Sequence, residues 1–232
     1  MSLSAPRNFG PQIHVIPSRS WPSMLAVAIL VLLCLHLALQ YDRFHTRFLP
    51  VELHALFDLD EEQNVPSWFS GAQLLLAAAL AFALGAARRQ GAPADGRAWN
   101  GMAAVLLFAS FDEIAGIHET LNSLIVMSWA IPFGILGLVV ALAFVPFVGR
   151  LPAPTRNGII LSGALYFMGA IVVELITSQY FDQDTKRQFR YALFTWVEES
   201  LELFGVWVLV RTLIAYMNAM RLSLAVARNS EA

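Results

Sequence analysis

Six apolar stretches alternate with shorter polar segments along this chain. Each is about 20 residues long, which is enough to cross the hydrocarbon core of a bilayer, about 30 Å thick, as an α-helix. We therefore predict an all-α fold, a polytopic membrane protein built as a bundle of six transmembrane helices. The predicted spans are residues 21–40, 67–87, 99–119, 128–148, 157–178 and 191–216.

The polar segments divide the chain into one membrane domain and two tails. Residues 21–217 form the predicted transmembrane domain, and residues 1–20 and 218–232 are predicted to be cytoplasmic tails. The first tail lacks the charged start, apolar centre and small-residue cleavage site of a signal peptide. The longest connection, residues 41–66, is rich in acid and is predicted to be an extracytoplasmic loop or a short interfacial helix.

Basic residues set this orientation, because short loops rich in Lys and Arg stay in the cytoplasm. With six spans, both tails lie on one side together with the second and fourth loops. That side holds Arg7, Arg19, Arg88, Arg89, Arg97, Arg150, Arg156, Arg221 and Arg228. The other side holds Arg43, Arg47, Lys186, Arg187 and Arg190.

Composition agrees with a membrane protein and argues against a nucleic-acid partner and against a disulfide within the chain. Hydrophobic residues make up 57% of the 232 residues, charged residues only 14%, and mean hydropathy is +0.60. The net charge is -2 without a long basic run, so no nucleic-acid partner is expected. Cys34 is the single cysteine, so no disulfide can form within the chain.

Candidate chemistry begins with the segment Phe111-Asp-Glu-Ile-Ala-Gly-Ile-His-Glu-Thr-Leu121 in the third predicted span. Charged groups within a membrane are expensive and therefore indicate function. If the segment is one helix, Asp112 and Glu119 share a face, with the small residues Ala115 and Gly116 between them. Glu113 and His118 flank that face and widen the polar sector.

Other polar residues are predicted at the same depth, in the outer half of the bilayer. Spans of alternating direction bring together His36 late in the first span and Glu174 late in the fifth, at the level of Asp112. Glu198, Glu199 and Glu202 begin the sixth span and share an arc of about 100°. Three neighbouring anions repel one another unless protons, basic residues or a bound cation neutralise them.

We interpret this cluster as a metal site, because carboxylates and neutral imidazole suit iron, manganese or zinc. The candidate metal ligands are Asp112, Glu113, His118, Glu119, Glu199, Glu202 and His36. Glu198 and Glu174 are the candidate catalytic bases. The Glu-x-x-His signature of di-iron bundles is absent before His118 and His36. The leading hypothesis is a metal-dependent enzyme, a hydrolase or an oxidoreductase, acting on a lipid or other hydrophobic substrate in the bilayer.

Several alternatives stay open at this point. The same acids would serve a cation- or proton-coupled transporter, or they would be structural in an accessory subunit that contacts partners in a membrane complex. His36 alone is typical of a core histidine bonded to backbone. Asp58, Asp60, Glu62 and Asn64 alternate as in a calcium loop, but Gln63 replaces the required glycine, so a solvated acidic helix cap is the competing interpretation. The aromatic residues Trp68, Trp129 and Trp196 are predicted to form an interfacial belt.

Two segments also resemble a known group of proteins. They are Leu56-Phe-Asp-Leu-Asp-Glu-Glu-Gln-Asn-Val-Pro-Ser-Trp-Phe-Ser70 and Ala109-Ser-Phe-Asp-Glu-Ile-Ala-Gly-Ile-His-Glu119, the second containing Asp-Glu-x4-His-Glu. They look like motifs of uncharacterised multi-pass bacterial membrane proteins, over about residues 55–121 and the Glu198-Glu-Ser-Leu-Glu202 segment. The resemblance implies a location in the bacterial inner membrane and brings no activity with it.

Overall fold

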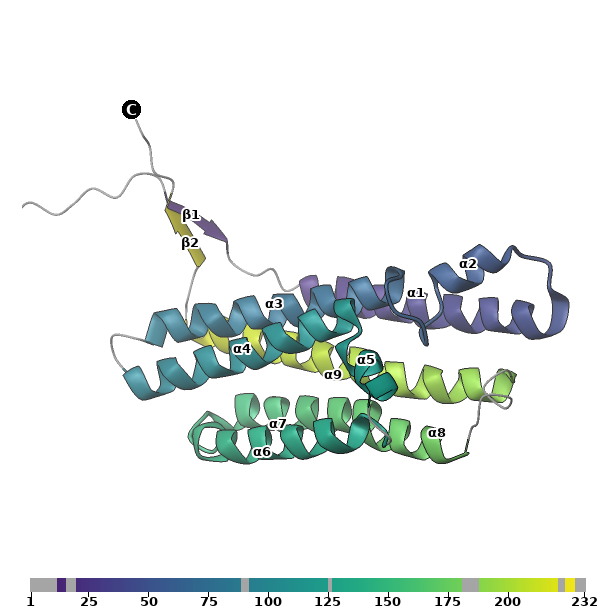
Figure 1. Cartoon of the computed structure of the whole chain (residues 1–232). Helices are drawn as coiled ribbons and strands as arrows, with labels where there is room; N and C mark the ends of the chain where they lie inside the picture. The colour runs from purple at the N-terminus through teal and green to yellow at the C-terminus, as the bar shows by residue number, and fades with distance from the viewer. Residues whose placement is uncertain are drawn as a thin grey trace, which may run out of the picture.

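The computed structural model describes residues 12–15, 20–88, 92–124, 127–180, 188–220 and 224–227. These residues form a bundle of helices that run along one long axis (Figure 1). The helices are α1 (Trp21–Tyr41), α2 (Val51–Leu56), α3 (Val65–Arg88), α4 (Pro93–Ala115), α5 (Ile117–Leu124), α6 (Ala130–Val148), α7 (Ala153–Phe167), α8 (Glu174–Tyr180) and α9 (Phe189–Ala219), with π-helical segments η1 (Asp42–Thr46) and η2 (Met168–Val173). In the tails, β1 (Gln12–Val15) pairs antiparallel with β2 (Leu224–Ala227).

Five helical segments in the described part of the chain are long and apolar enough to cross a membrane. They are Trp21–Thr46, Val65–Arg88, Ala130–Val148, Ala153–Tyr180 and Phe189–Ala219. Helix α4 has 23 residues but is more polar than these five, because Asp95, Arg97, Asp112 and Glu113 lie within it. The all-α fold is confirmed, and the helices are compatible with an integral membrane protein.

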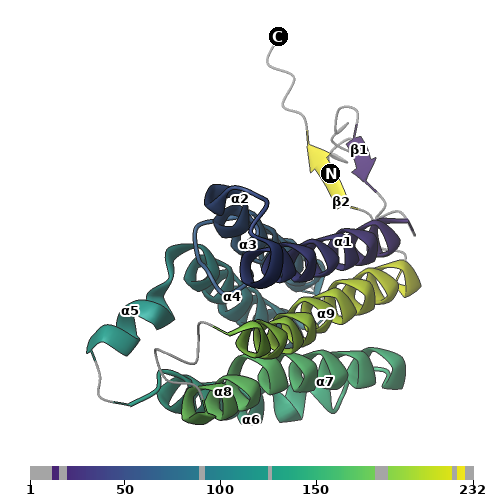
Figure 2. The ribbon, with the colours of Figure 1, turned by 90° about the vertical axis from the view of Figure 1, so that its right-hand side faces the viewer.

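Helix α9 lies at the centre of the bundle. It packs against α1, α3 and α7, with α1, α3 and α4 on one side and α6, α7 and α8 on the other (Figure 2). Two indole N–H groups of α9 donate to backbone oxygens of α1: Trp196 to Leu33 at 3.2 Å and Trp207 to Pro22 at 2.6 Å. The largest core joins α3, α4 and α9 around the fully buried Trp99 and Val210.

The third predicted span is corrected by the structure, because Gly116 ends its helix. Gly116 has a φ of 61°, in the left-handed region that glycine adopts easily, and its N–H bonds the Asp112 carbonyl at 2.8 Å. Helix α4 therefore stops at Ala115, and α5 begins at Ile117 in a new direction. Asp112 and Glu119 do not share a face of one helix as predicted. Gly116 provides a turn there and not a small contact surface.

The connection between α1 and α3 is folded by buried polar groups. The Asp42 carboxylate accepts hydrogen bonds from the Thr46 hydroxyl and from the N–H groups of Phe48 and Leu49, the latter two at 3.0 Å. Its Oδ2 also lies 3.0 Å from Nε2 of the buried His54 on α2. This acid therefore shapes the connection, which was predicted as an acidic loop or a short helix and which contains the short helix α2.

The start of α3 is set by a reciprocal cap. The Ser67 N–H donates to Asn64 Oδ1, and the Asn64 N–H donates to Ser67 Oγ, both at 3.1 Å. Such a pair satisfies backbone N–H groups that have no partner in the first turn of a helix. Helix α3 therefore begins at Val65, two residues before the predicted boundary.

Candidate functional site

A cavity of about 160 Å³ lies between the connection before α3 and the helices α4, α5, α8 and α9. Seven carboxyl groups line it: Asp60, Glu61, Glu62, Glu113, Glu174, Glu198 and Glu199. The other lining residues are Leu59, Pro66, Ser67, His118, Trp129, Tyr191 and Thr195. Histidine is the only basic residue type in this described lining, so the cavity is rich in oxygen donors that little basic charge opposes.

Part of this lining agrees with the sequence prediction. The structure brings together Glu113, His118, Glu174, Glu198 and Glu199, which come from α4, α5, α8 and α9. They are far apart in the sequence and meet because consecutive helices alternate in direction. These five predicted site residues therefore line one cavity.

His118 is held by an acid on each side of its ring. Its Nδ1 lies 3.0 Å from Asp112 Oδ2, and its Nε2 lies 3.4 Å from Glu62 Oε1. The His118 backbone N–H also donates to Asp112 Oδ1 at 3.1 Å. The turn at Gly116 makes this possible, since it folds α5 back toward the end of α4. The Trp129 ring lies against the imidazole, with centroids 4.6 Å apart.

The surroundings of His118 change its pKa in opposite directions. Burial lowers the pKa, whereas the hydrogen bond and charge of Asp112 and the charges of Glu62 and Glu113 raise it. The acids outweigh burial, so the pKa of His118 lies above its ordinary value. In the metal-free protein this favours an imidazolium that bridges Asp112 and Glu62.

The remaining predicted ligands lie outside the described lining of the cavity. Asp112 contacts it only through His118. Glu202, 9% exposed, lies one turn beyond Glu198 on α9, where it packs against Gly169 of η2. The side chain of Glu119 lies outside the described residues. The π-helix η2 ends directly before Glu174, and π-helical turns occur frequently at functional sites.

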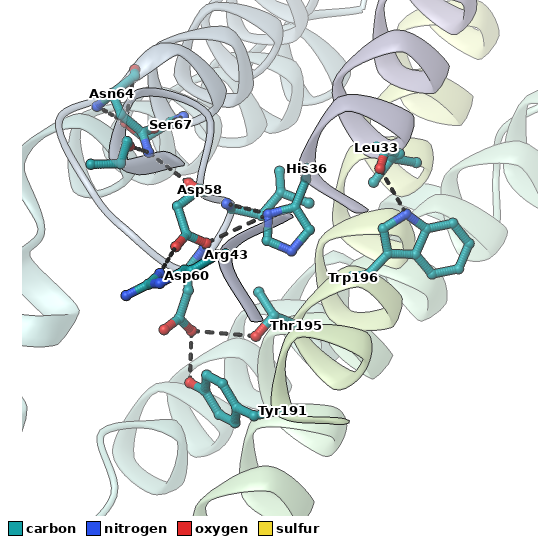
Figure 3. Close-up of polar contacts among 12 residues, drawn as sticks. Leu33, His36, Arg43, Asp58, Asp60, Asn64, Ser67, Tyr191, Thr195 and Trp196 are labelled. Atoms are coloured by element: carbon teal, nitrogen blue, oxygen red, sulfur yellow. Dashed lines mark hydrogen bonds and ion pairs between the residues drawn. The ribbon is translucent and has the colours of Figure 1, made fainter. Parts of the chain in front are cut away.

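His36 belongs to a separate cluster behind the cavity wall (Figure 3). It is 1% exposed, and its Nδ1 accepts the Leu59 N–H at 3.0 Å. Asp58 Oδ1 lies 3.5 Å from the same nitrogen, and Asp58 Oδ2 accepts from Arg43 at 3.0 Å. His36 therefore fixes the chain at Leu59, as expected of a core histidine bonded to backbone, although here it accepts an N–H.

The calcium-loop interpretation is wrong, because its carboxylates have different partners. Asp58 binds Arg43, whereas Asp60 Oδ1 accepts from the Tyr191 hydroxyl at 2.7 Å and from Thr195 at 3.4 Å (Figure 3). Glu62 reaches His118. The competing interpretation, a solvated acidic cap, fits Asp60 and Glu61, which are exposed, but not Asp58, which is 3% exposed.

The acids of this connection were not predicted as site residues. Asp60, Glu61 and Glu62 line the cavity together with Trp129, Tyr191 and Thr195. The predicted topology gave one indication that these acids belong to the site, because it put the 41–66 connection at the same end of the bundle as His118. Of the three tryptophans predicted to form an interfacial belt, Trp68 is exposed. Trp129 lines the cavity, and Trp196 donates a hydrogen bond to α1.

The cavity offers donors for a cation without forming a finished metal site. Among the described residues, no group of three or more His, Cys, Asp or Glu side chains is already arranged around one point. The pair formed by His118 Nε2 and Glu62 Oε1 is nevertheless 3.4 Å apart. That is about the separation of two ligands bound to one metal at about 2.0–2.2 Å each.

Comparisons with known proteins give a family but no activity. No curated protein and no solved structure matches the chain. The family model described as "Domain of unknown function (DUF8692)" matches residues 24–217, which include every helix from α3 to α8 and nearly all of α1 and α9. The chain therefore belongs to this family.

Proposed function

We propose that this protein is an integral-membrane enzyme that binds a divalent transition metal in the acidic cavity and acts on a lipid or other hydrophobic substrate. The observation that carries the proposal is the placement of His118, whose Nε2 faces Glu62 in a cavity lined by carboxylates. Acidic side chains around an imidazole suit iron, manganese or zinc. A divalent ion would also offset the repulsion among the carboxylates.

Each proposed ligand has support in the geometry. Asp112 contacts Nδ1 of His118, as outer carboxylates do in metal sites, where they orient the ring so that Nε2 binds the ion. Glu62, Glu113 and Glu199 supply oxygen donors in the same cavity. Because the described donors are not yet gathered around one point, binding would draw these flexible side chains inward.

Glu174 and Glu198 are the proposed general bases. Both line the cavity, and they come from α8 and α9. A carboxylate in that place would accept a proton from water or substrate while the ion polarises the reacting group. The exposed apolar surface of α6, including Ile135 and Leu142, agrees with contact to lipid.

We further propose that α4 is a sixth span and that the cavity faces the extracytoplasmic side of a bacterial inner membrane. Helix α4 packs along α3, and its 23 residues are long enough to cross the bilayer core. The lysine and arginine distribution supports the orientation. The bacterial location rests on the resemblance of the two acidic motifs.

Metal analysis tests the proposed function. We expect purified protein to contain iron, manganese or zinc in stoichiometric amount, and His118→Gln and Glu62→Gln to lose most of it. Removing the ion with a chelator should lower the melting temperature of the parent protein and leave the two variants unchanged, because a ligand of the folded state stabilises it. Glu52→Gln is the matched control, since Glu52 is an exposed acid on α2. Metal-free parent protein that melts identically with chelator would contradict the proposal.

A cation- or proton-coupled transporter is the second candidate, and Glu202 favours it. This buried acid lies on α9 one turn further into the bundle than the cavity acids. Beyond it, however, Leu80, Leu84 and Leu213 belong to an apolar core with 0–3% exposure. A transport path would have to cross that layer. Flux of a labelled divalent cation into proteoliposomes would favour this candidate over the enzyme.

A further inference from the structure

The outer wall of the cavity is a short irregular segment. Residues 57–64 connect α2 to α3 without helix or strand, and Leu59, Asp60, Glu61 and Glu62 within them line the cavity. A wall built from one such segment can move without disturbing the packing of the helices. Its mobility depends on how its two ends and its middle are fastened.

Both ends of the segment are firmly fixed. Leu59 packs in a buried cluster with Ile29, Leu33 and Leu203, and its N–H bonds the buried His36. At the other end, the Asn64 side chain donates to the Asp58 carbonyl at 2.6 Å. Moving Leu59 would expose apolar surface to water, so it serves as a fixed point.

The middle of the segment is attached differently. Asp60, Glu61 and Gln63 are exposed. Asp60 is fastened to α9 by the hydroxyls of Tyr191 and Thr195, and Glu62 is fastened to α5 by His118. Tyr191 and Thr195 are 8% and 3% exposed, so their hydroxyls gain water partners only when the segment moves away. Exchanging such polar contacts for water has a smaller net cost than exposing buried apolar packing.

The backbone also favours movement at this point. Gln63 has a φ of 60°, the left-handed conformation that a residue with a Cβ adopts only at a cost. A rearrangement of residues 60–63 would release that strain.

We infer that residues 60–63 form a lid that opens the acidic cavity to the aqueous phase, hinged at Leu59 and Asn64 and latched by the Tyr191 hydroxyl to Asp60. The closed lid completes the cavity by bringing in Asp60, Glu61 and Glu62. The open lid gives a ligand or substrate headgroup a way in. This inference goes beyond the proposed function and holds for any ligand that the cavity takes.

Thiol labelling tests the lid directly. In a Cys34→Ser background, Glu174→Cys places one thiol in the cavity lining on α8, outside the lid, and a cationic, water-soluble thiol reagent reports its access. We expect Tyr191→Phe to raise the labelling rate roughly tenfold, because it removes a hydrogen bond to a charged acceptor. Tyr216→Phe is the matched control, since the Tyr216 hydroxyl lies on the same helix but bonds Arg88 of α3.

Substituting Asp60, the acceptor of the Tyr191 hydrogen bond, distinguishes loss of that bond from other effects of Tyr191→Phe. Asp60→Ala should raise the rate as Tyr191→Phe does, and Asp60→Asn, which keeps an acceptor oxygen, should raise it less. Labelling is done on chelator-treated protein whose melting temperature shows that it is folded, so failure of the metal proposal leaves this result interpretable. Equal labelling rates in the folded parent, Tyr191→Phe and Asp60→Ala proteins would contradict the inference that residues 60–63 form a lid.

Discussion

His118 links three segments through one imidazole ring. Asp112 at the end of α4 contacts Nδ1, Glu62 of the lid contacts Nε2, and Trp129 covers the ring. Because both acids favour the protonated ring, the pKa of His118 is raised in the folded protein relative to the unfolded chain. Its contribution to stability is therefore complete below the unfolded pKa, about 6.5, and is lost as pH rises through the folded pKa.

We predict that this contribution appears as pH-dependent stability of the metal-free protein. His118→Gln should lower the free energy of unfolding by about 2 kcal/mol near pH 6, where charge-assisted hydrogen bonds are formed, and by less near pH 9. Melting of chelator-treated protein at the two pH values measures the difference. His45→Gln is the control, because the His45 side chain is exposed. A destabilisation by His118→Gln that is equal at both pH values would contradict the bridge.

At the scale of helices, the site depends on the close approach of α7 and α9. A Cβ added at Gly205 of α9 would lie 2.9 Å from the backbone nitrogen of Tyr166 and 3.2 Å from the carbonyl oxygen of Ser162. Backbone atoms cannot turn aside as a side chain can. The absence of a Cβ at Gly205 therefore lets α9 pack against α7, close to where Glu202 meets η2.

We predict that Gly205→Ala lowers the free energy of unfolding by about 2 kcal/mol, the usual cost of overpacking a tight contact. Gly163→Ala should leave stability unchanged or raise it slightly, since a Cβ there would meet no atom within 4 Å and alanine favours helix. Thermal unfolding of the two variants in the same detergent makes the comparison. Equal melting temperatures would show that α7 and α9 are not held at this distance.

At the scale of the whole molecule, the direction of the helices places the site at one end. The start of α9 lies at the end opposite to the connection between α3 and α4, and helix α5 lies between these two ends (Figure 1). The proposed orientation, which rests on the arginine distribution, would put the site outside the cytoplasm.

We predict that a membrane-impermeant thiol reagent added to intact cells labels Glu61→Cys but not Ala94→Cys, both in the Cys34→Ser background. Both positions are exposed, Glu61 in the lid and Ala94 in the first turn of α4 at the far end. The measurement is labelling before and after the cells are broken. The reverse pattern would invert the orientation and place the cavity toward the cytoplasm.

The sequence by itself determined most of the long helices and brought most of the acids to one end of the bundle. Long apolar runs give spans that agree closely with the structure, as for residues 67–87 against Val65–Arg88, because burial in lipid requires a fixed length. Alternating direction then brings Glu113, Glu174 and Glu198 to one level, whatever the packing.

Only the tertiary structure decided which of these groups share the cavity. The apolar pattern gave no reason to break the third span at Gly116, so the return of His118 to Asp112 was missed. The pairing of Asp60 with Tyr191 joins residues 131 positions apart, and the exclusion of Glu202 depends on how α9 is rotated against η2. Helix rotation and loop folding are set by side-chain packing between distant segments, which periodicity along one segment does not encode.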